Sequence, residues 1–122
     1  EKMRLTGPGG VIMTPINTGN VEASNGVTAS MLAFDIRYNG GSAINITADP
    51  QIVAGTDGQI IEFTGLSDVN TLTFDNGTGL VLNAASTTCV LGDGDIISFR
   101  YVLSCTKWIE RFRSNNSGCT PP

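Results

Sequence analysis

Residues 31–38 read MLAFDIRY, and this stretch decides the fold class. Its larger apolar side chains occupy every second position from residue 32 onward, with Asp35 and Arg37 between them. A period of two residues is typical of a β-strand with one buried face and one face in water. The sequence NGG at 39–41 follows and predicts a turn, because Asn and Gly tolerate positive φ angles. The stretch therefore predicts a half-buried strand that ends in a turn.

The rest of the chain repeats this alternation of short apolar segments and turn formers. Further strand candidates lie at 10–14, 43–48, 59–63, 71–74, 80–82, 88–91, 96–103 and 107–113. Many short strands at such spacing are typical of sandwiches, jelly rolls and barrels. We therefore predict an all-β, single-domain, jelly-roll-like β-sandwich of eight or nine short antiparallel strands.

The chain has 122 residues, the usual size of one domain. Residues 1–10 include the sequence GPGG and predict an N-terminal arm. Residues 11–113 carry the strand pattern and form the predicted sandwich domain. Residues 114–122 have no apolar period and predict a C-terminal tail.

Two segments of the predicted domain echo each other. Residues 55–63 read GTDGQIIEF and residues 91–99 read LGDGDIISF. Each is a Gly/Asp turn that leads into Ile-Ile-polar-Phe. Equivalent strands of a double Greek key would produce such an echo, and convergence on a common turn-strand pattern would produce it as well.

The charge pattern argues against nucleic acid and membrane partners. The net charge is −4, and a nucleic-acid protein needs a basic footprint. No apolar run reaches the roughly 20 residues that cross a bilayer. Residues 39–98 contain no Lys or Arg, whereas four basic residues cluster at the end of the domain: Arg100, Lys107, Arg111 and Arg113. The split fits two solvated patches, or an acidic face of one subunit that meets a basic face of the next.

Catalytic patterns are weak in this sequence. The chain has no histidine, which excludes Ser-His-Asp and Cys-His catalysis and most zinc and iron sites. Asp93 with Asp95, or Asp57 with Glu62, could be nominated as glycosidase pairs, but Asp-Gly is also a turn former. We predict that the protein is not an enzyme and needs no cofactor, with calcium in the acidic loops as an open alternative.

The three cysteines and the single tryptophan leave alternatives open. A Cys89–Cys105 disulfide requires the two residues to lie on neighbouring antiparallel strands, and it would leave Cys119 unpaired. Three free thiols are the other reading. Trp108 fits packing at a sheet end or between subunits better than an exposed sugar-binding platform.

Three segments carry a resemblance to a known class of protein. They are residues 72–80 (LTFDNGTGL), 91–99 (LGDGDIISF) and 107–116 (KWIERFRSNN). As an ordered set they resemble β-rich modules of phage virion proteins, found in tail fibres, tailspikes, head fibres and capsid decoration proteins. Residues 103–106 (LSCT) depart from the Asp-Gly hairpin that often precedes the Trp in such modules.

The resemblance implies a non-catalytic structural protein at the virion surface, outside the cell. It would assemble with itself as a trimer and contact a major capsid or other virion protein, with a host-surface glycan as a further partner. We assign Trp108 and Phe112 as packing anchors and Arg100, Arg111 and Arg113 as partners for acidic residues of a neighbour. A subunit of a cellular extracellular filament or surface layer, and a carbohydrate-binding adhesin, are the alternatives.

Overall fold

The structure is a computed structural model that describes residues 4–5, 11–12, 16–18, 34–46, 50–77, 79–83 and 87–116. The first three of these ranges are described as strands only. Across the described ranges the chain contains no α-helix, and one 3₁₀ turn, η1 (Leu103–Cys105), joins two strands. The predicted all-β class is confirmed.

The larger sheet has six strands in the order β3-β4-β6-β10-β11-β8. Its strands are β3 (Ile16–Thr18), β4 (Asp35–Tyr38), β6 (Ile60–Gly65), β8 (Leu80–Val81), β10 (Ile96–Val102) and β11 (Lys107–Ser114). The smaller sheet has the order β5-β7-β9. Its strands are β5 (Ile44–Asn45), β7 (Leu72–Asp75) and β9 (Thr88–Leu91).

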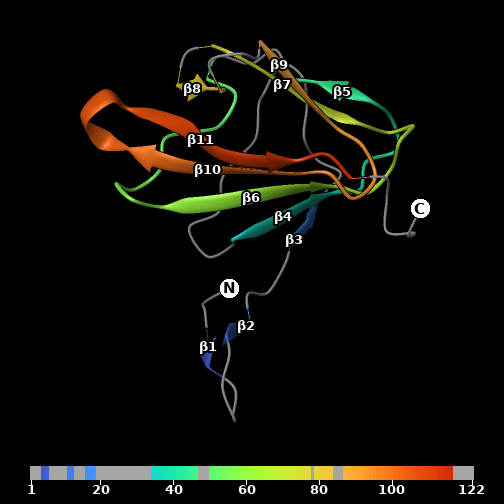
Figure 1. The fold of residues 1–122 in the computed structure, drawn as a ribbon, viewed down its shortest axis with the longest axis horizontal. Helices are drawn as coiled ribbons and strands as arrows, with labels where there is room; N and C mark the ends of the chain where they lie inside the picture. Colours follow the sequence, from blue (N-terminus) through green and yellow to red (C-terminus); the bar gives the residue numbers. More distant parts are fainter. Residues whose placement is uncertain are drawn as a thin grey trace.

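A separate two-stranded pairing lies near the N-terminus. It joins β1 (Arg4–Leu5) and β2 (Val11–Ile12) in antiparallel register. In Figure 1 this pair lies below the two larger sheets. The segment expected to be an arm, residues 1–10, therefore contains a short strand.

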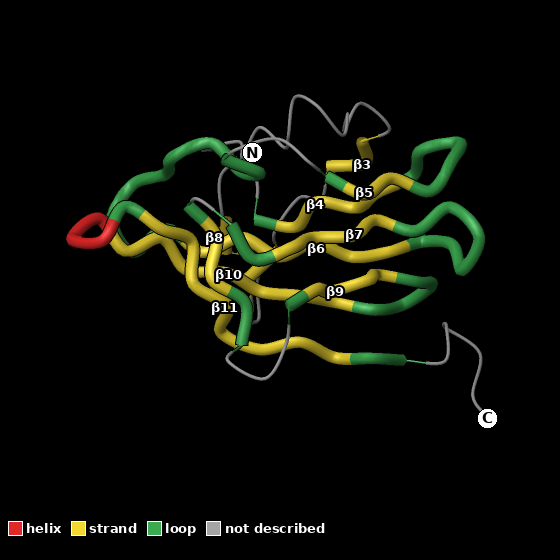
Figure 2. The backbone as a smooth tube through the Cα atoms, turned by 90° about the horizontal axis from the view of Figure 1, so that it is seen from above, coloured by secondary structure: helices red, strands yellow, loops and turns green. Residues whose placement is uncertain are grey.

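The two larger sheets pack face to face. Figure 1 shows β5, β7 and β9 above β10, β6 and β4 of the six-stranded sheet, and in Figure 2, seen from above, β7 lies over β6 and β9 lies over β10. Phe63 of β6, Phe74 of β7 and Phe99 of β10 meet between the sheets, with ring centroids 5.0 to 6.1 Å apart in edge-to-face geometry. All three rings are fully buried, so an aromatic cluster joins the two layers.

Half of the strand pairings are parallel, which corrects the prediction of an antiparallel sandwich. The parallel pairs are β3–β4, β4–β6, β5–β7 and β8–β11. After β4, the turn at residues 39–41 carries the chain to β5 in the other sheet, and the chain then returns to β6 beside β4. Parallel neighbours require such a crossover, since a tight hairpin can join only antiparallel strands.

The two echoing segments become β6 and β10, which lie side by side and run antiparallel. Their register pairs Phe63 with Ile97 and Ile61 with Phe99, and all four side chains are buried. The echo therefore marks two central strands that build one part of the core from opposite directions.

A close approach of backbones fixes the end of β6. A Cβ atom at Gly65 would collide with the carbonyl oxygen of Gly92. The Gly65 N–H donates to the Asp95 carbonyl oxygen at 2.9 Å, and the Gly94 N–H donates to the Gly65 carbonyl oxygen at 3.0 Å. Only glycine leaves room at residue 65 for the turn that enters β10.

Most predicted strands lie within about two residues of those observed, and the sequence missed β1 and β3. The predicted strand at 31–38 is described only from residue 34, and its first three residues lie outside the described ranges. β11 reaches Ser114, the first residue of the predicted tail. Within the described residues, no helix has the length and hydropathy that a bilayer crossing requires.

Candidate interaction surface on the six-stranded sheet

The six-stranded sheet has one face toward the core and one face away from it, called here the outer face. Burial alternates along β6, with Ile61 and Phe63 inside and Glu62 outside. The register places Asp35 of β4 beside Glu62, and Ser98 of β10 on the other side of Glu62. Ser98 in turn pairs with Phe112 of β11. One row of residues on the outer face thus crosses four strands, and we call it the central row. Its members are Asp35, Glu62, Ser98, Phe112 and the neighbouring Arg111.

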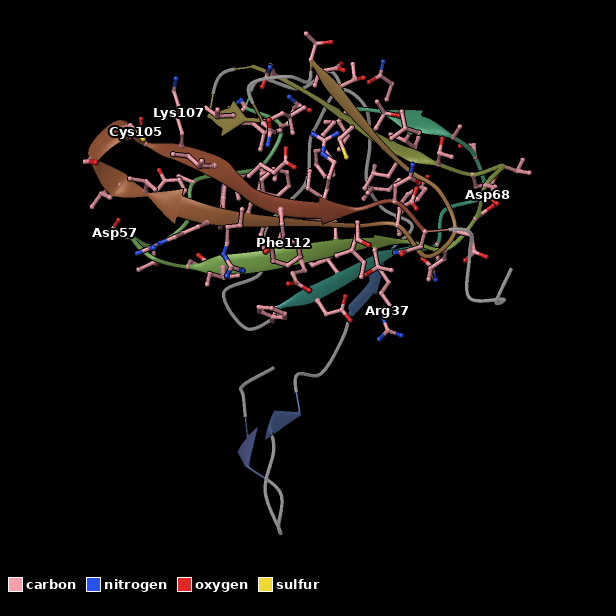
Figure 3. The ribbon with its side chains drawn as sticks, viewed as in Figure 1. Arg37, Asp57, Asp68, Cys105, Lys107 and Phe112 are labelled. Carbon is pink, nitrogen blue, oxygen red and sulfur yellow. The ribbon has the colours of Figure 1, made fainter. Side chains whose placement is uncertain are left out.

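A β-bulge places Arg111 and Phe112 together on this row. Ser98 pairs with Phe112, whereas Phe99 pairs with Glu110, so Arg111 is an extra residue on β11. A bulge of this kind interrupts the alternation and leaves two adjacent side chains on one side. The Arg111 guanidinium lies 5.4 Å from the centroid of the Phe112 ring, and this ring is 46% exposed. The bulge therefore presents an aromatic–arginine pair on the surface of a sheet, and Phe112 of this pair is labelled in Figure 3.

Ser98 is fully buried although it belongs to the outer face. The Arg111 Nη1 donates to the Ser98 Oγ at 3.1 Å, and Glu62 also hydrogen-bonds to Ser98. Burial raises the pKa of Glu62, the negative charge of Asp35 raises it further, and Arg111 opposes both effects. The serine hydroxyl thus links an acidic and a basic side chain across β6, β10 and β11.

A groove lies beside the central row, at the end of the outer face formed by β4 and β6. Its volume is about 450 Å³, and its apolar lining comes from Phe34, Leu66 and Ile96. Asp35 and Arg37 form one wall, where the Arg37 Nη2 lies 3.1 Å from the Asp35 Oδ2. Leu66 is 40% exposed, so the groove offers apolar surface with a charged rim.

Charge is segregated between the outer face and the rest of the described residues. By strand alternation the outer face carries four cations against the carboxylates of Asp35 and Glu62, which leaves +2. The remaining described residues carry two cations, Arg4 and Arg113, against six carboxylates, which leaves −4. The four cations of the outer face are Arg37, Arg100, Lys107 and Arg111.

The predicted assembly residues divide between the two sides of the sheet. Arg100, Arg111 and Phe112 lie on the outer face. Trp108 lies inside with no exposed surface, where its Nε1 donates to the Val53 carbonyl oxygen at 2.9 Å. Arg113 lies on the inner side of β11, where its guanidinium donates to Glu110 and to the Thr88 carbonyl oxygen.

Arg113 forms a two-point ion pair with a nearly buried carboxylate. Its Nη2 and Nε donate to the two carboxylate oxygens of Glu110, both at 2.8 Å. The Glu110 side chain is only 3% exposed and also accepts the Asn83 N–H at 2.7 Å. These bonds lower the pKa of Glu110, with the Arg113 hydrogen bond as the largest cause. Arg113 is therefore paired within its own strand, and its Nη1 also donates to the Thr88 carbonyl oxygen of β9 at 3.3 Å.

The suggested Cys89–Cys105 disulfide is wrong for this structure, since both thiols are free. Cys89 lies in β9, whose paired neighbour is β7, and Cys105 lies in the η1 turn that follows β10 in the other sheet. The two residues are therefore not on neighbouring strands. Burial raises the pKa of Cys89, which keeps this thiol protonated. Cys119 lies outside the described residues.

Two of the four carboxylates nominated as catalytic pairs, those of Asp95 and Asp57, accept hydrogen bonds from backbone N–H groups. The Asp95 carboxylate accepts the Gly92 N–H at 2.9 Å and the Asn116 N–H at 2.7 Å. Asp57 accepts the Leu103 N–H at 2.9 Å. Among the described residues, no group of three or more Cys, Asp or Glu side chains is arranged to hold a metal ion.

Sequence reasoning missed Asp35, Glu62 and Ser98 as members of one surface. The two-residue period predicts that each points outward, but the strand order that brings them together is a property of the fold. Searches with the whole chain match no protein-family model, no curated protein and no solved structure.

Proposed function

We propose that this protein is a non-catalytic structural subunit of a virion surface that assembles with copies of itself. The virion assignment rests on the resemblance of three segments to phage virion modules. These segments form β7 and the β8 region, the turn and strand of β10, and β11, which together build much of the core. The resemblance also implies a jelly roll. Because half of the described strand pairs are parallel, the jelly-roll topology is part of this proposal only.

The single observation that supports assembly is the exposed Arg111–Phe112 pair on β11, the second strand from one edge of the six-stranded sheet. Aromatic and arginine side chains dominate the energetic centres of protein interfaces. Phe112 leaves about half of its surface in water in the monomer, and the bulge holds it beside Arg111. Association would remove this apolar surface from water, which is the main favourable term in most protein–protein contacts.

The test is to locate the protein on particles. Antibodies raised against the folded chain would be used for gold labelling of purified virions in electron microscopy. We expect label at regular positions on the capsid or on fibres. Label on cellular filaments, with bare virions, would overturn the virion assignment and support the filament alternative.

Mass measurement of the purified protein provides a second test. Self-assembly predicts oligomers, and the resemblance implies a trimer. A protein that stays monomeric at every concentration and binds an array of glycans would overturn self-assembly and support the adhesin alternative. Trp108 is fully buried, so such binding would have to use another residue.

A further inference from the structure

The outer face carries both a projection and a recess. Phe112 projects from β11, and the groove lined by Phe34, Leu66 and Ile96 lies at the β4–β6 end. Glu62 at the groove and Phe112 are two strand positions apart in one row, a separation of roughly 10 Å. A projection and a recess side by side on one face fit a second copy of the same face.

The charges on this face also form two complementary halves, one acidic and one basic. The central row begins with the carboxylates of Asp35 and Glu62 on β4 and β6, and it ends with the guanidinium of Arg111 on β11. Arg100 adds a second cation on β10. A twofold axis between β6 and β10 that relates two copies face to face places the basic half of each copy opposite the acidic half of the other. Surfaces that are complementary to themselves in this way form isologous twofold contacts.

The residues that would make the contact are already held in place within the monomer. Arg111 is fixed by its bond to the Ser98 Oγ at 3.1 Å and by the Phe112 ring. Asp35 is fixed by Arg37 and by the Thr64 Oγ1 at 3.4 Å. Ordering these side chains on association therefore costs little further conformational entropy.

We propose that two copies of this chain pack outer face to outer face across a twofold axis that lies between β6 and β10. Phe112 of each copy enters the groove of the other, and Arg111 of each copy lies opposite Asp35 and Glu62 of the other. The proposal rests on the self-assembly proposed above and identifies the surface that carries it. An unrelated partner would need to match only one half of the face, whereas a second copy matches both halves at once.

The size of the face sets the expected strength. Four strands, each counted as about six residues, span roughly 19 by 20 Å. The flat area is therefore about 400 Å² per copy, without the extra area of side chains that project from the face. The two copies together would bury about 800 Å², which is below the roughly 1,200–2,000 Å² of stable specific interfaces, so we expect a weak dimer in dilute solution. Many copies on one particle would strengthen the contact through multivalency.

The test uses complementary charge reversals, measured by analytical ultracentrifugation of the whole chain from about 1 µM to about 1 mM. Arg111→Glu and Glu62→Arg, each alone, place like charges across the axis and should weaken dimerisation by about tenfold or more. An equal mixture of the two variants should form a heterodimer more tightly than either variant forms a homodimer, because the two reversed charges then face each other and the original Arg111–Glu62 contact is kept on the other side of the axis. Asp35 still faces one reversed charge, so the affinity should stay below that of the wild type. Damage to folding within one chain would not be repaired by mixing.

Matched controls lie on the other sheet. Asp75→Lys reverses a charge on the outward side of β7, and Val90→Ser removes an apolar side chain on β9 that is 54% exposed. Both controls should dimerise as the wild type does, and Phe112→Ser should not. Wild-type protein that assembles equally well as Arg111→Glu, Glu62→Arg or Phe112→Ser would overturn this contact and leave self-assembly standing. A trimer without a dimer would do the same, whereas a wild type that is monomeric throughout would overturn both proposals.

Discussion

Trp108 is the only tryptophan in the chain, and it lies wholly inside the molecule. Its ring packs edge-to-face on Tyr101 with centroids 5.1 Å apart. Its indole N–H reaches the Val53 carbonyl oxygen, 55 residues away in the sequence. One side chain therefore packs in the core and also holds the loop before β6 against the sheet.

The first prediction concerns this hydrogen bond. Trp108→Phe keeps an aromatic ring but leaves the Val53 carbonyl oxygen without its donor, and we expect a loss of about 1–3 kcal/mol in the free energy of unfolding. Trp108→Ala should cost about 3–5 kcal/mol because it also opens a cavity. Urea unfolding followed by circular dichroism measures both. Equal stability of Trp108→Phe and wild type would contradict the role of the bond.

Glu110 and Glu62 should respond to pH in opposite ways. The pKa of Glu110 is lowered in the folded state, so its carboxylate stabilises the protein above the unfolded pKa of about 4.3, and this contribution is lost as the pH falls through the folded pKa. The pKa of Glu62 is raised, so its protonated form is favoured by folding, and that stabilisation is lost as the pH rises from about 4.3 through the folded pKa.

The second prediction follows from this difference. Glu110→Gln should lower the free energy of unfolding at neutral pH by about 1–3 kcal/mol, since a charged hydrogen bond is lost. Glu62→Gln should equal or exceed the wild type there. Both differences should shrink as the pH is lowered below about 4. Urea titrations at a series of pH values measure them, and a loss of stability for Glu62→Gln at neutral pH would contradict the stated sign.

The β10–β11 hairpin contributes Arg100, Arg111 and Phe112 to the outer face. It closes through the η1 turn and Thr106, whose φ of 53° and ψ of 44° are left-handed. A β-branched residue is strained in this conformation, whereas Asn and Gly are not. Residues 103–106 (LSCT) contain no Gly, and Thr106 takes the left-handed position that Gly would adopt without strain.

The third prediction is that Thr106→Asn stabilises the protein by about 0.5–1 kcal/mol through relief of this strain. Thermal unfolding measures the gain. The control is Ser104→Asn in the same turn, which is exposed and outside the left-handed region and should leave the stability unchanged. A destabilised Thr106→Asn would show that the Thr106 hydroxyl, which donates to the Cys105 carbonyl oxygen at 2.7 Å, outweighs the strain.

The fourth prediction concerns the bulge. Deletion of Arg111 restores regular alternation along β11, so Glu110 and Phe112 keep their pairing with Phe99 and Ser98 and their faces of the sheet. We expect a folded protein with a lower melting temperature, because the Ser98 hydroxyl loses its Arg111 donor. Circular dichroism and amide hydrogen exchange of β10 and β11 test this. An unfolded product would show that the bulge is needed for the fold itself.

At the scale of the whole molecule, the charges are unevenly distributed. The outer face of the six-stranded sheet is positive, and the loops and the remaining described surface are negative. Such a distribution steers the approach of a partner more than it adds affinity. The acidic half of the central row makes the same face able to receive its own basic half.

The fifth prediction is that self-association weakens as salt rises. From about 0.1 M to about 1 M, the Debye length falls from about 10 Å to about 3 Å, which screens the contacts of Arg111 with Asp35 and Glu62. Sedimentation should show a severalfold weaker dimer, and Phe112→Ser should remain monomeric at both salt concentrations. Association that strengthens steadily with salt would indicate an apolar contact without the proposed ion pairs.

The alternation of apolar and polar residues in the sequence was enough to predict most of the strands. Residues such as Ile61 and Phe63 alternate with polar neighbours, and this period fixes which side of each strand is buried wherever the strand lies. The Asp-Gly pairs at 57–58 and 93–94 also predicted turns. Gly58 and Gly94 adopt positive φ angles of 81° and 84°, which glycine permits. The β2 to β11 strands were thus largely predictable, with β3 as the exception.

Tertiary structure alone decided which strands are neighbours. The chain crosses between sheets after β4, so β4 pairs with β6 in parallel, and no local signal encodes that choice. The same order brings Asp35, Glu62, Ser98 and Arg111 into one row, and it separates Cys89 from Cys105. The sequence by itself determined an all-β chain with alternating faces, because side-chain period is a local property. Only the fold determined the outer face and its bulge, because strand pairing and register depend on contacts between residues far apart in the chain.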